Sequence, residues 1–189
     1  ALTSATVRFN PFAPPKNAGP GFMANASVMR PYSRGAVKIT GADPGAAPDI
    51  RLNYLSDPRD LDTLVDAVGM LREVFAQKPF DRFRGAELQP GPEVATRDEI
   101  ATWARKTAST VHHLSGSCRM GADAHSVVDP ELRVRGVQGL RVADASVFPS
   151  IPSTNTAAPA IMVGEKAADL IRNGSPADGS AGQGADQTA

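Results

Sequence analysis

The stretch that decides the fold of this chain reads Val127-Val128-Asp129-Pro130-Glu131-Leu132-Arg133-Val134-Arg135-Gly136-Val137-Gln138-Gly139-Leu140-Arg141-Val142-Ala143-Asp144-Ala145-Ser146. Its part from Leu140 to Asp144 is a short apolar run that ends in an acid, which predicts a buried strand. Ligands of open α/β sheets bind at the carboxyl ends of the strands, so Asp144 is a candidate for accepting hydrogen bonds from sugar or ribityl hydroxyls. The alternative is an ordinary aspartate that caps a turn.

A segment rich in glycine and serine, residues 112–121, lies just before this stretch and begins with the adjacent histidines His112 and His113. Histidine is the side chain that takes up a proton near neutral pH, which makes both residues candidates for acid–base chemistry. An ordinary buried or surface histidine is the alternative for each. The run Ser115-Gly116-Ser117 lacks the G-x-S-x-G pattern of a nucleophile elbow, so serine hydrolase chemistry is not expected.

A third stretch, residues 152–159, leads directly into the last helix that the pattern predicts. This helix is expected to begin near Asn155, to have Pro159 in its first turn and to end at Gly174. Its inner face is expected to consist of Ile161, Val163, Ala167, Leu170 and Ile171. A helix start offers free N–H groups and about half a positive charge, which suits a group that becomes negative during a reaction. A plain asparagine cap is the alternative.

Upstream, the sequence predicts several short strands. One is expected near Thr6–Phe9, in a lead-in with several prolines. Two more are expected at Ala24–Arg30 and Gly35–Thr40, joined as a hairpin by the turn at Tyr32–Gly35.

The same region predicts helices from their caps and their apolar spacing. Asp57-Pro58 opens the clearest helix, because Asp57 can cap it and Pro58 suits the first helical position. Its apolar stripe consists of Leu61, Leu64, Val65, Val68, Leu71 and Phe75. A short helix is expected at Phe80–Phe83. The pattern Thr96-x-x-Glu99 is a capping box, which predicts a helix that runs to about Thr107.

Taken together, the three stretches resemble the carboxyl-terminal signature of the glucose–methanol–choline (GMC) oxidoreductases. That signature has a histidine, four residues and then Cys-x-Met-Gly, here His113 and Cys118-Arg119-Met120-Gly121. The run Val127–Ser146 follows, and then a His or Asn before the final helix, here Asn155-Thr156. Met29–Val37, Asp43-Pro44 and Asn53-Tyr54-Leu55 also look like that family's substrate domain. The resemblance covers about residues 24–172.

The resemblance implies an α+β fold in which an antiparallel-sheet substrate domain has flanking helices. A strand and a C-terminal helix then complete an FAD-binding α/β domain. The chain accordingly divides into an irregular proline-rich lead-in (1–23), a substrate-binding domain (24–124), a return into the FAD-binding domain (125–172) and a tail (173–189). The tail is expected to be disordered, because it contains no apolar residue larger than alanine.

In the family, an alcohol is oxidised to a carbonyl compound while hydride passes to N5 of the flavin. By resemblance, His113 is the base that takes the hydroxyl proton, and Asn155 hydrogen-bonds the substrate oxygen. Asparagine cannot titrate near neutral pH, so only His113 acts as a base. The resemblance implies FAD as the cofactor, and the residues expected to bind it are His112, Asp144, Ala145, Asn155, Thr156 and Ala157. The N–H groups of the helix start would stabilise negative charge on the reduced ring.

The family's strand–GxGxxG–helix unit, which holds the ADP half of FAD, does not occur in these residues. The chain is therefore expected to be the carboxyl-terminal part of an enzyme or one subunit of a split one. Its expected partners are a small-molecule alcohol and an N-terminal FAD-binding segment or subunit. Two alternatives stay open. One is a hydroxynitrile-lyase-type reaction on the same scaffold, and the other is a non-catalytic subunit without the FAD domain.

Composition limits the other classes of function. The chain has 189 residues, a mass of 19.7 kDa, and 20 basic against 20 acidic residues. This balance argues against a disordered chain and a nucleic-acid binder. No apolar run of about 18 residues occurs, so no membrane span is expected. One cysteine and three histidines make a poor ligand set, and no metal site is expected. The free cysteine and the lack of a visible signal peptide make the cytoplasm the expected location.

Overall fold

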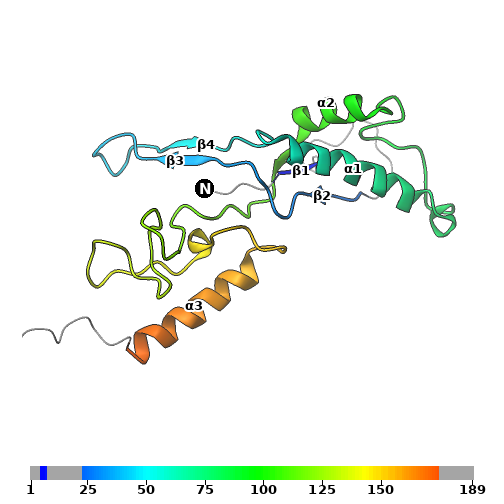
Figure 1. The fold of residues 1–189 in the computed structure, drawn as a ribbon. Helices are drawn as coiled ribbons and strands as arrows, with labels where there is room; N and C mark the ends of the chain where they lie inside the picture. The colour runs from blue at the N-terminus through cyan, green and yellow to red at the C-terminus, as the bar shows by residue number, and fades with distance from the viewer. Residues whose placement is uncertain (1–4, 8–22, 175–189) are drawn as a thin grey trace, which may run out of the picture.

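The computed structural model describes residues 5–7 and 23–174 of the chain, as Figure 1 shows. The elements follow in the order β1 (Ala5–Val7), β2 (Ala26–Ser27), β3 (Ala36–Lys38), β4 (Asp49–Arg51), α1 (Pro58–Phe75), η1 (Lys78–Phe80), α2 (Arg97–Thr107), β5 (Ser109–Thr110), η2 (Ala145–Val147) and α3 (Ala157–Arg172). All strand pairs are antiparallel, in one sheet of order β2-β1-β5 and one of order β3-β4. This arrangement confirms the predicted α+β class.

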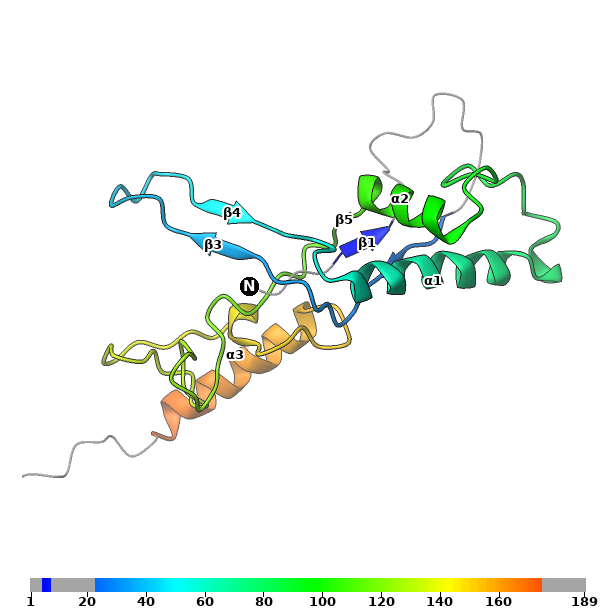
Figure 2. The same cartoon turned by 45° about the horizontal axis from the view of Figure 1, so that its top comes forward.

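The elements gather at two ends of the molecule, and each end has its own core. Figures 1 and 2 show α1 and α2 beside the β2-β1-β5 sheet at one end and α3 beneath the long loops at the other. The first core is formed by Val28, Leu61, Leu64, Val65, Val68, Ile100 and Ala104. The second is formed by Val128, Leu132, Val147, Phe148, Val163 and Ala167. The β3–β4 hairpin projects from the first end over the second.

Helix α1 forms where its capping signals predict it. Asp57 is the N-cap, its carboxylate accepts a hydrogen bond from the Arg59 amide at 3.0 Å, and Pro58 occupies the first turn. Four residues of the predicted stripe, Leu61, Leu64, Val65 and Val68, are buried. Apolar residues spaced three and four apart lie on one face of a helix, and this face packs on the sheet and on α2.

The Asp57 cap makes the stability of α1 sensitive to acid. A side-chain hydrogen bond from Arg59 is the main reason why the pKa of Asp57 is lowered from 3.8 to about 2. A carboxyl with a depressed pKa contributes stability above its unfolded pKa and loses it as the pH falls through the folded one. We therefore expect the stability advantage over Asp57→Asn, measured by urea unfolding, to hold near neutral pH and to shrink between about pH 4 and about pH 2. An advantage that is equal at both ends of this range would contradict the assignment.

The other two long helices also begin and end close to their predicted boundaries. Thr96 and Glu99 form the complete capping box of α2. Helix α3 ends at Arg172, before Gly174, whose φ of 57° closes the helix in the left-handed conformation. Its inner face is narrower than predicted, because Ile161 and Ile171 are 68% and 64% exposed. The short helix after α1 is a single turn at Lys78–Phe80, two residues earlier than predicted.

The predicted hairpin between Ala24–Arg30 and Gly35–Thr40 is wrong. β2 pairs with β1, and β3 pairs with β4. The expected turn cannot close, because Asp60 of α1 accepts hydrogen bonds from the amides of Tyr32 and Ser33 at 2.9 and 2.8 Å. These contacts hold the connecting segment on α1. Of the strand predicted near Thr6–Phe9, the described residues form β1, the central strand of its sheet.

The predicted buried strand at Leu140–Asp144 is also wrong. This segment makes one bridge, between Arg141 and Arg133, and Leu140 is 49% exposed. The amide of Val134 donates to the carbonyl of Leu140 at 2.9 Å, so the segment folds back on residues 132–134 across a tight turn. A strand needs neighbours on both sides to be buried, and among the described residues the Leu140–Asp144 segment has one.

None of the helices in the described part of the chain is long and apolar enough to cross a membrane. Of the predicted tail, only Asn173 and Gly174 lie within the described residues.

Candidate active site

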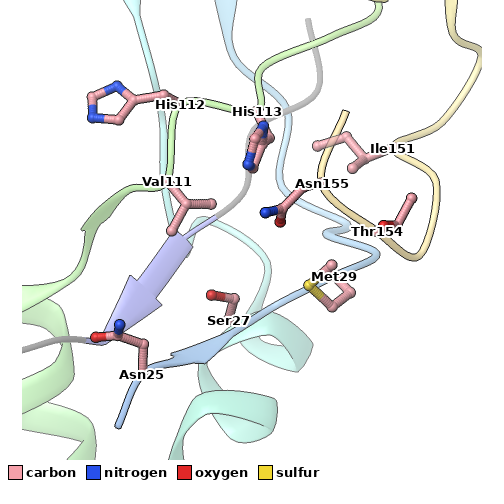
Figure 3. Close-up of a pocket in the computed structure, with 9 residues that line it drawn as sticks. All are labelled: Asn25, Ser27, Met29, Val111, His112, His113, Ile151, Thr154 and Asn155. Atoms are coloured by element: carbon pink, nitrogen blue, oxygen red, sulfur yellow. The ribbon is translucent and has the colours of Figure 1, made fainter. Parts of the chain in front are cut away.

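A cavity of about 280 Å³ lies at the junction of the two ends. Three segments line it: one around β2, one that follows β5 and one that precedes α3. The lining residues, drawn in Figure 3, are Asn25, Ser27, Met29, Val111, His112, His113, Ile151, Thr154 and Asn155. The two residues predicted to be catalytic, His113 and Asn155, are therefore brought to one cavity from distant parts of the sequence.

The wall formed by the β2 segment follows from the alternation of side chains along an extended chain. Ala26 and Val28 are 8% and 4% exposed, and Val28 belongs to the first core. Asn25, Ser27 and Met29 point the opposite way and line the cavity. We did not predict these three as site residues. The sequence does contain a pattern that indicates a polar face, because small and apolar residues alternate with polar ones within the predicted strand.

The two adjacent histidines point in different directions. β5 ends at Thr110, whose hydroxyl accepts a hydrogen bond from the His112 amide at 2.9 Å. His112 has a φ of 63°, in the left-handed region that few residues other than glycine adopt. The turn separates the rings, and Figure 3 shows the ring of His112 directed away from Asn155. Unusual backbone conformations of this kind are concentrated at functional sites.

His113 is half-buried and is held through one ring nitrogen. Its Nδ1 lies 3.0 Å from the hydroxyl oxygen of Thr156, and the backbone N–H of Thr156 donates to the same nitrogen at 3.4 Å. Thr156 was predicted as a cofactor-binding residue, and this stays a prediction; in the structure its hydroxyl contacts His113. Nδ1 is occupied in this way, which leaves Nε2 as the ring nitrogen for a ligand in the cavity.

Asn155 is positioned by a tight turn ahead of α3. The amide of Thr154 donates to the carbonyl of Pro152 at 2.6 Å, and Ile151 is buried beneath the turn. Asn155 itself is exposed toward the cavity, beside His113 in Figure 3. Thr156, and not Asn155, is the N-cap residue of α3. The plain-cap alternative for Asn155 is thereby excluded, and its amide is available to a ligand.

A hydrogen bond from the Arg30 side chain to the Ser153 hydroxyl links the two sides of the junction. Arg30 follows Met29 on one wall of the cavity, and Ser153 precedes Thr154 on another. The contact therefore joins the β2 wall of the cavity to the wall that carries Asn155.

A second cavity, of about 320 Å³, contains two more of the predicted cofactor contacts, Asp144 and Ala145, whereas Ala157 lies at the exposed start of α3. Asp144 accepts a hydrogen bond from the Ser146 amide at 2.7 Å and caps η2, so the turn-capping role is present. The hydroxyl groups of Ser115 and Ser146 also belong to residues of this cavity. Both are buried and have no hydrogen-bond partner in the described structure. A ligand that supplies polar atoms could satisfy them, since buried polar groups are nearly always paired.

Backbone hydrogen bonds hold the segment after His113 against η2. The amide of Cys118 donates to the carbonyl of Ser146 at 3.0 Å, and that of Met120 donates to Val147 at 2.8 Å. Arg119 closes the following turn with two hydrogen bonds to Asp123, which hold the pKa of that carboxyl far below its usual range. Adjoining residues of this segment line the two cavities: His112 and His113 the first, and Leu114, Ser115 and Ser117 the second. Within residues 5–7 and 23–174, no three acidic, histidine or cysteine side chains gather to hold a metal ion.

Comparisons with known proteins agree on one family. The family model described as GMC oxidoreductase matches residues 31–164. The chain is 46% identical over 156 residues to the oxygen-dependent choline dehydrogenase of Chromohalobacter salexigens, and 48% identical over 160 residues to that of Vibrio vulnificus. These matches cover 82% and 84% of the chain but only 28% and 29% of the two relatives.

A similar fold occurs in solved structures. The structure of a fungal aryl-alcohol oxidase matches with a TM-score of 0.74 and 33% identity, over 80% of this chain and 25% of that one. The chain thus spans between a quarter and a third of the length of these proteins.

Proposed function

The chain belongs to the GMC oxidoreductase family, and from this premise we propose that it provides the substrate-binding and proton-accepting part of an FAD-dependent alcohol oxidation site. The observation that carries the proposal is the cavity in which His113 and Asn155 meet. A basic nitrogen and a neutral amide beside one small cavity suit the deprotonation and orientation of an alcohol. The proposed reaction class is oxidation of a CH–OH group.

In this proposal His113 takes the hydroxyl proton of the alcohol at Nε2, the ring nitrogen that Thr156 does not engage. Removing the proton raises the electron density on oxygen and makes the neighbouring carbon a better hydride donor. General-base assistance of this kind is typically worth about 10²–10⁴-fold in rate. FAD, when bound, would supply the hydride acceptor.

Asn155 orients the substrate. Its amide can donate to the oxygen from which His113 takes the proton, and it keeps the same charge at every physiological pH. The two side chains therefore divide the task, because one moves a proton and the other fixes the position of the oxygen.

The residues around the second cavity fit a flavin nucleotide. FAD carries hydroxyl, phosphate and ring polar groups, and the buried hydroxyls of Ser115 and Ser146 need such partners. We propose that Asp144 and Ala145 contact this cofactor, and that Ala157 at the exposed start of α3 does so as well. His112 is proposed as a further contact, from the rim of the first cavity.

The outer face of α3 supports a larger FAD-binding domain around this part of the chain. Ile161, Met162 and Ile171 are 68%, 58% and 64% exposed. Apolar side chains clustered on one helix are commonly buried against another protein surface. We propose that residues 125–172 pack against an FAD-binding segment, which would be the chain's main protein partner.

The cavity lining that this chain contributes contains no group typical of a cation site. Choline, the substrate in the names of the two relatives, is a cation, and cations are commonly bound by carboxylates or by aromatic faces. The nine lining residues include no carboxylate and no Phe, Tyr or Trp. An assay should therefore compare choline with neutral primary alcohols.

A chimaera tests the proposed function. The part of the C. salexigens enzyme that this chain matches is replaced by the present chain, and the purified protein is examined by visible spectroscopy. We expect a flavin spectrum that bleaches when a suitable alcohol is added without oxygen. The unmodified relative is the positive control, and the relative truncated before the matched region is the negative control.

The alternatives give different spectra. Retained flavin that no alcohol bleaches, with cleavage of a cyanohydrin, would indicate a lyase. Retained flavin with neither reaction would indicate a non-catalytic role. If the 189-residue chain alone binds stoichiometric FAD and is bleached by an alcohol, the proposed dependence on an FAD-binding partner is wrong.

A further inference from the structure

We propose that Arg30 is a positioning residue, which holds the turn that carries Asn155 against the β2 wall of the cavity. This inference deepens the proposed function and rests on it, because it concerns how the amide that orients the substrate is kept in place. It begins from the hydrogen bond that Nε of Arg30 donates to the hydroxyl oxygen of Ser153, across 123 positions of sequence. Ser153 belongs to the same turn as Asn155 and directly precedes Thr154, which lines the cavity.

The backbone that carries Arg30 is anchored to the first end of the molecule. Pro31 and Ser33, which follow it, are buried, and Asp60 of α1 accepts a hydrogen bond from the Ser33 amide at 2.8 Å. The guanidinium of Arg34 donates to the carbonyls of Pro31 and Ser33 at 2.8 and 3.1 Å. The side chain of Arg30 therefore extends from a well-held segment toward the turn.

The turn itself is exposed and is closed by a contact of its own. Residues 153–155 are all exposed. The hydrogen bond from the Thr154 amide to the Pro152 carbonyl closes the turn and joins two of its own residues. The donor from Arg30 comes from the other side of the junction, so it holds the turn from outside at Ser153. Removing this donor should let the turn open more often.

The guanidinium of Arg30 is a donor at every physiological pH. Arginine does not lose its proton in proteins, and hydrogen bonds from a charged donor are stronger than those between neutral groups. The bond is exposed to water, so we expect a net effect of about fivefold on the equilibrium between the held and the released turn. This equilibrium sets how often Asn155 faces the substrate oxygen.

Two neutral replacements separate the hydrogen bond from the charge. In Arg30→Gln the side-chain nitrogen is bonded to Cδ, as Nε of arginine is, so an N–H donor stays in the same place. Arg30→Met has a similar length and no donor. Ser153→Ala removes the acceptor and leaves Arg30 intact. Arg105→Met is the matched control, since Arg105 is exposed on α2.

The first measurement needs neither cofactor nor activity. Amide hydrogen exchange of Thr154 and Thr156 is recorded by NMR in the full chain, because exchange requires local opening of the turn. We expect exchange at both amides to be about fivefold faster in Arg30→Met and in Ser153→Ala, and no faster still in the double variant. Arg30→Gln and Arg105→Met should exchange within about twofold of the wild type.

Three results of this measurement overturn the proposal. The first is unchanged exchange in Arg30→Met. The second is equal acceleration in Arg30→Gln and Arg30→Met, which would assign the effect to the lost charge. The third is additive acceleration by Arg30→Met and Ser153→Ala, which would show that the two side chains act separately.

Kinetics of the flavin-containing chimaera separate this proposal from the proposed function. We expect Arg30→Met to lower the limiting rate of flavin bleaching about fivefold at unchanged FAD content, since a released turn leaves the substrate oxygen poorly oriented. Arg30→Gln should restore the rate. In an Asn155→Ala background, Arg30→Met should have no further effect on it.

The two proposals can fail separately. If exchange accelerates as expected while the rate stays the same, Arg30 holds the turn and the proposed role of Asn155 is wrong. If Arg30→Met lowers the rate further in the Asn155→Ala background, Arg30 does not act through Asn155, and the positioning role is overturned.

Discussion

Replacing His113 by alanine should lower the rate of alcohol oxidation by about 10²–10⁴-fold, because the substrate proton would then leave without a base. The effect should appear in the rate of flavin bleaching under anaerobic conditions, measured by stopped flow on the chimaera. The FAD content should stay the same, since the ring of His113 is held by Thr156 and faces the first cavity. The residual rate should rise with pH, as hydroxide takes over the removal of the proton.

His125→Ala is the matched control for this substitution. The side chain of His125 is exposed in a surface turn and lines neither cavity, and only its backbone amide is bonded, to Asp123 at 3.0 Å. This variant should keep the wild-type rate. A loss of less than about tenfold in His113→Ala would show that another group accepts the proton.

The helices could be predicted from the sequence because their signals are local. The Asp57-Pro58 pair and the Thr96–Glu99 capping box each contact residues within one turn of the helix they start. Apolar spacing then identified the buried face of α1. The exposure of Ile161 could not be predicted, because it depends on what covers α3 in space and not on the spacing along it.

Strand pairing was harder to predict because it is decided between distant segments. The sequence suggests a hairpin around Tyr32–Gly35, but Asp60, far along the chain, holds that segment on α1. The Leu140–Asp144 run has the composition of a buried strand. Its burial would require neighbouring strands that the described residues do not include.

For the site, motif spacing identified His113 and Asn155, and the structure brings both to one cavity. The contact between Thr156 and His113 could not be predicted in the same way. A threonine at a helix start ordinarily caps its own amides, and its helical backbone angles here are a result of the tertiary fold. Whether a buried polar side chain serves its own helix or a distant segment is therefore a question that the sequence leaves open.

Asp60 is another buried polar side chain that bonds a distant segment and not its own helix. Its removal should give the largest loss of stability. Asp60 is 2% exposed, and its carboxylate accepts hydrogen bonds from the amides of Tyr32 and Ser33 and from the Ser33 hydroxyl. Asp60→Ala would leave the two buried donors of Ser33 and the partly buried amide of Tyr32 without this acceptor. At about 1–3 kcal/mol for each buried unpaired group, the two donors of Ser33 alone should lower the free energy of unfolding by about 2–6 kcal/mol.

The measurement uses the single tryptophan of the chain. Trp103 of α2 packs against the same core, so its fluorescence during urea unfolding reports on this end of the molecule. Asp62→Ala is the matched control, because Asp62 is exposed on α1, and it should change the stability by no more than about 0.5 kcal/mol. Equal stabilities for the two variants would contradict the role of Asp60.

Because residues 32–33 continue the chain from the Asn25–Met29 wall of the cavity, loosening them should also widen the site. Asp60→Ala should therefore raise the KM of the chimaera for its alcohol as well as lowering its stability.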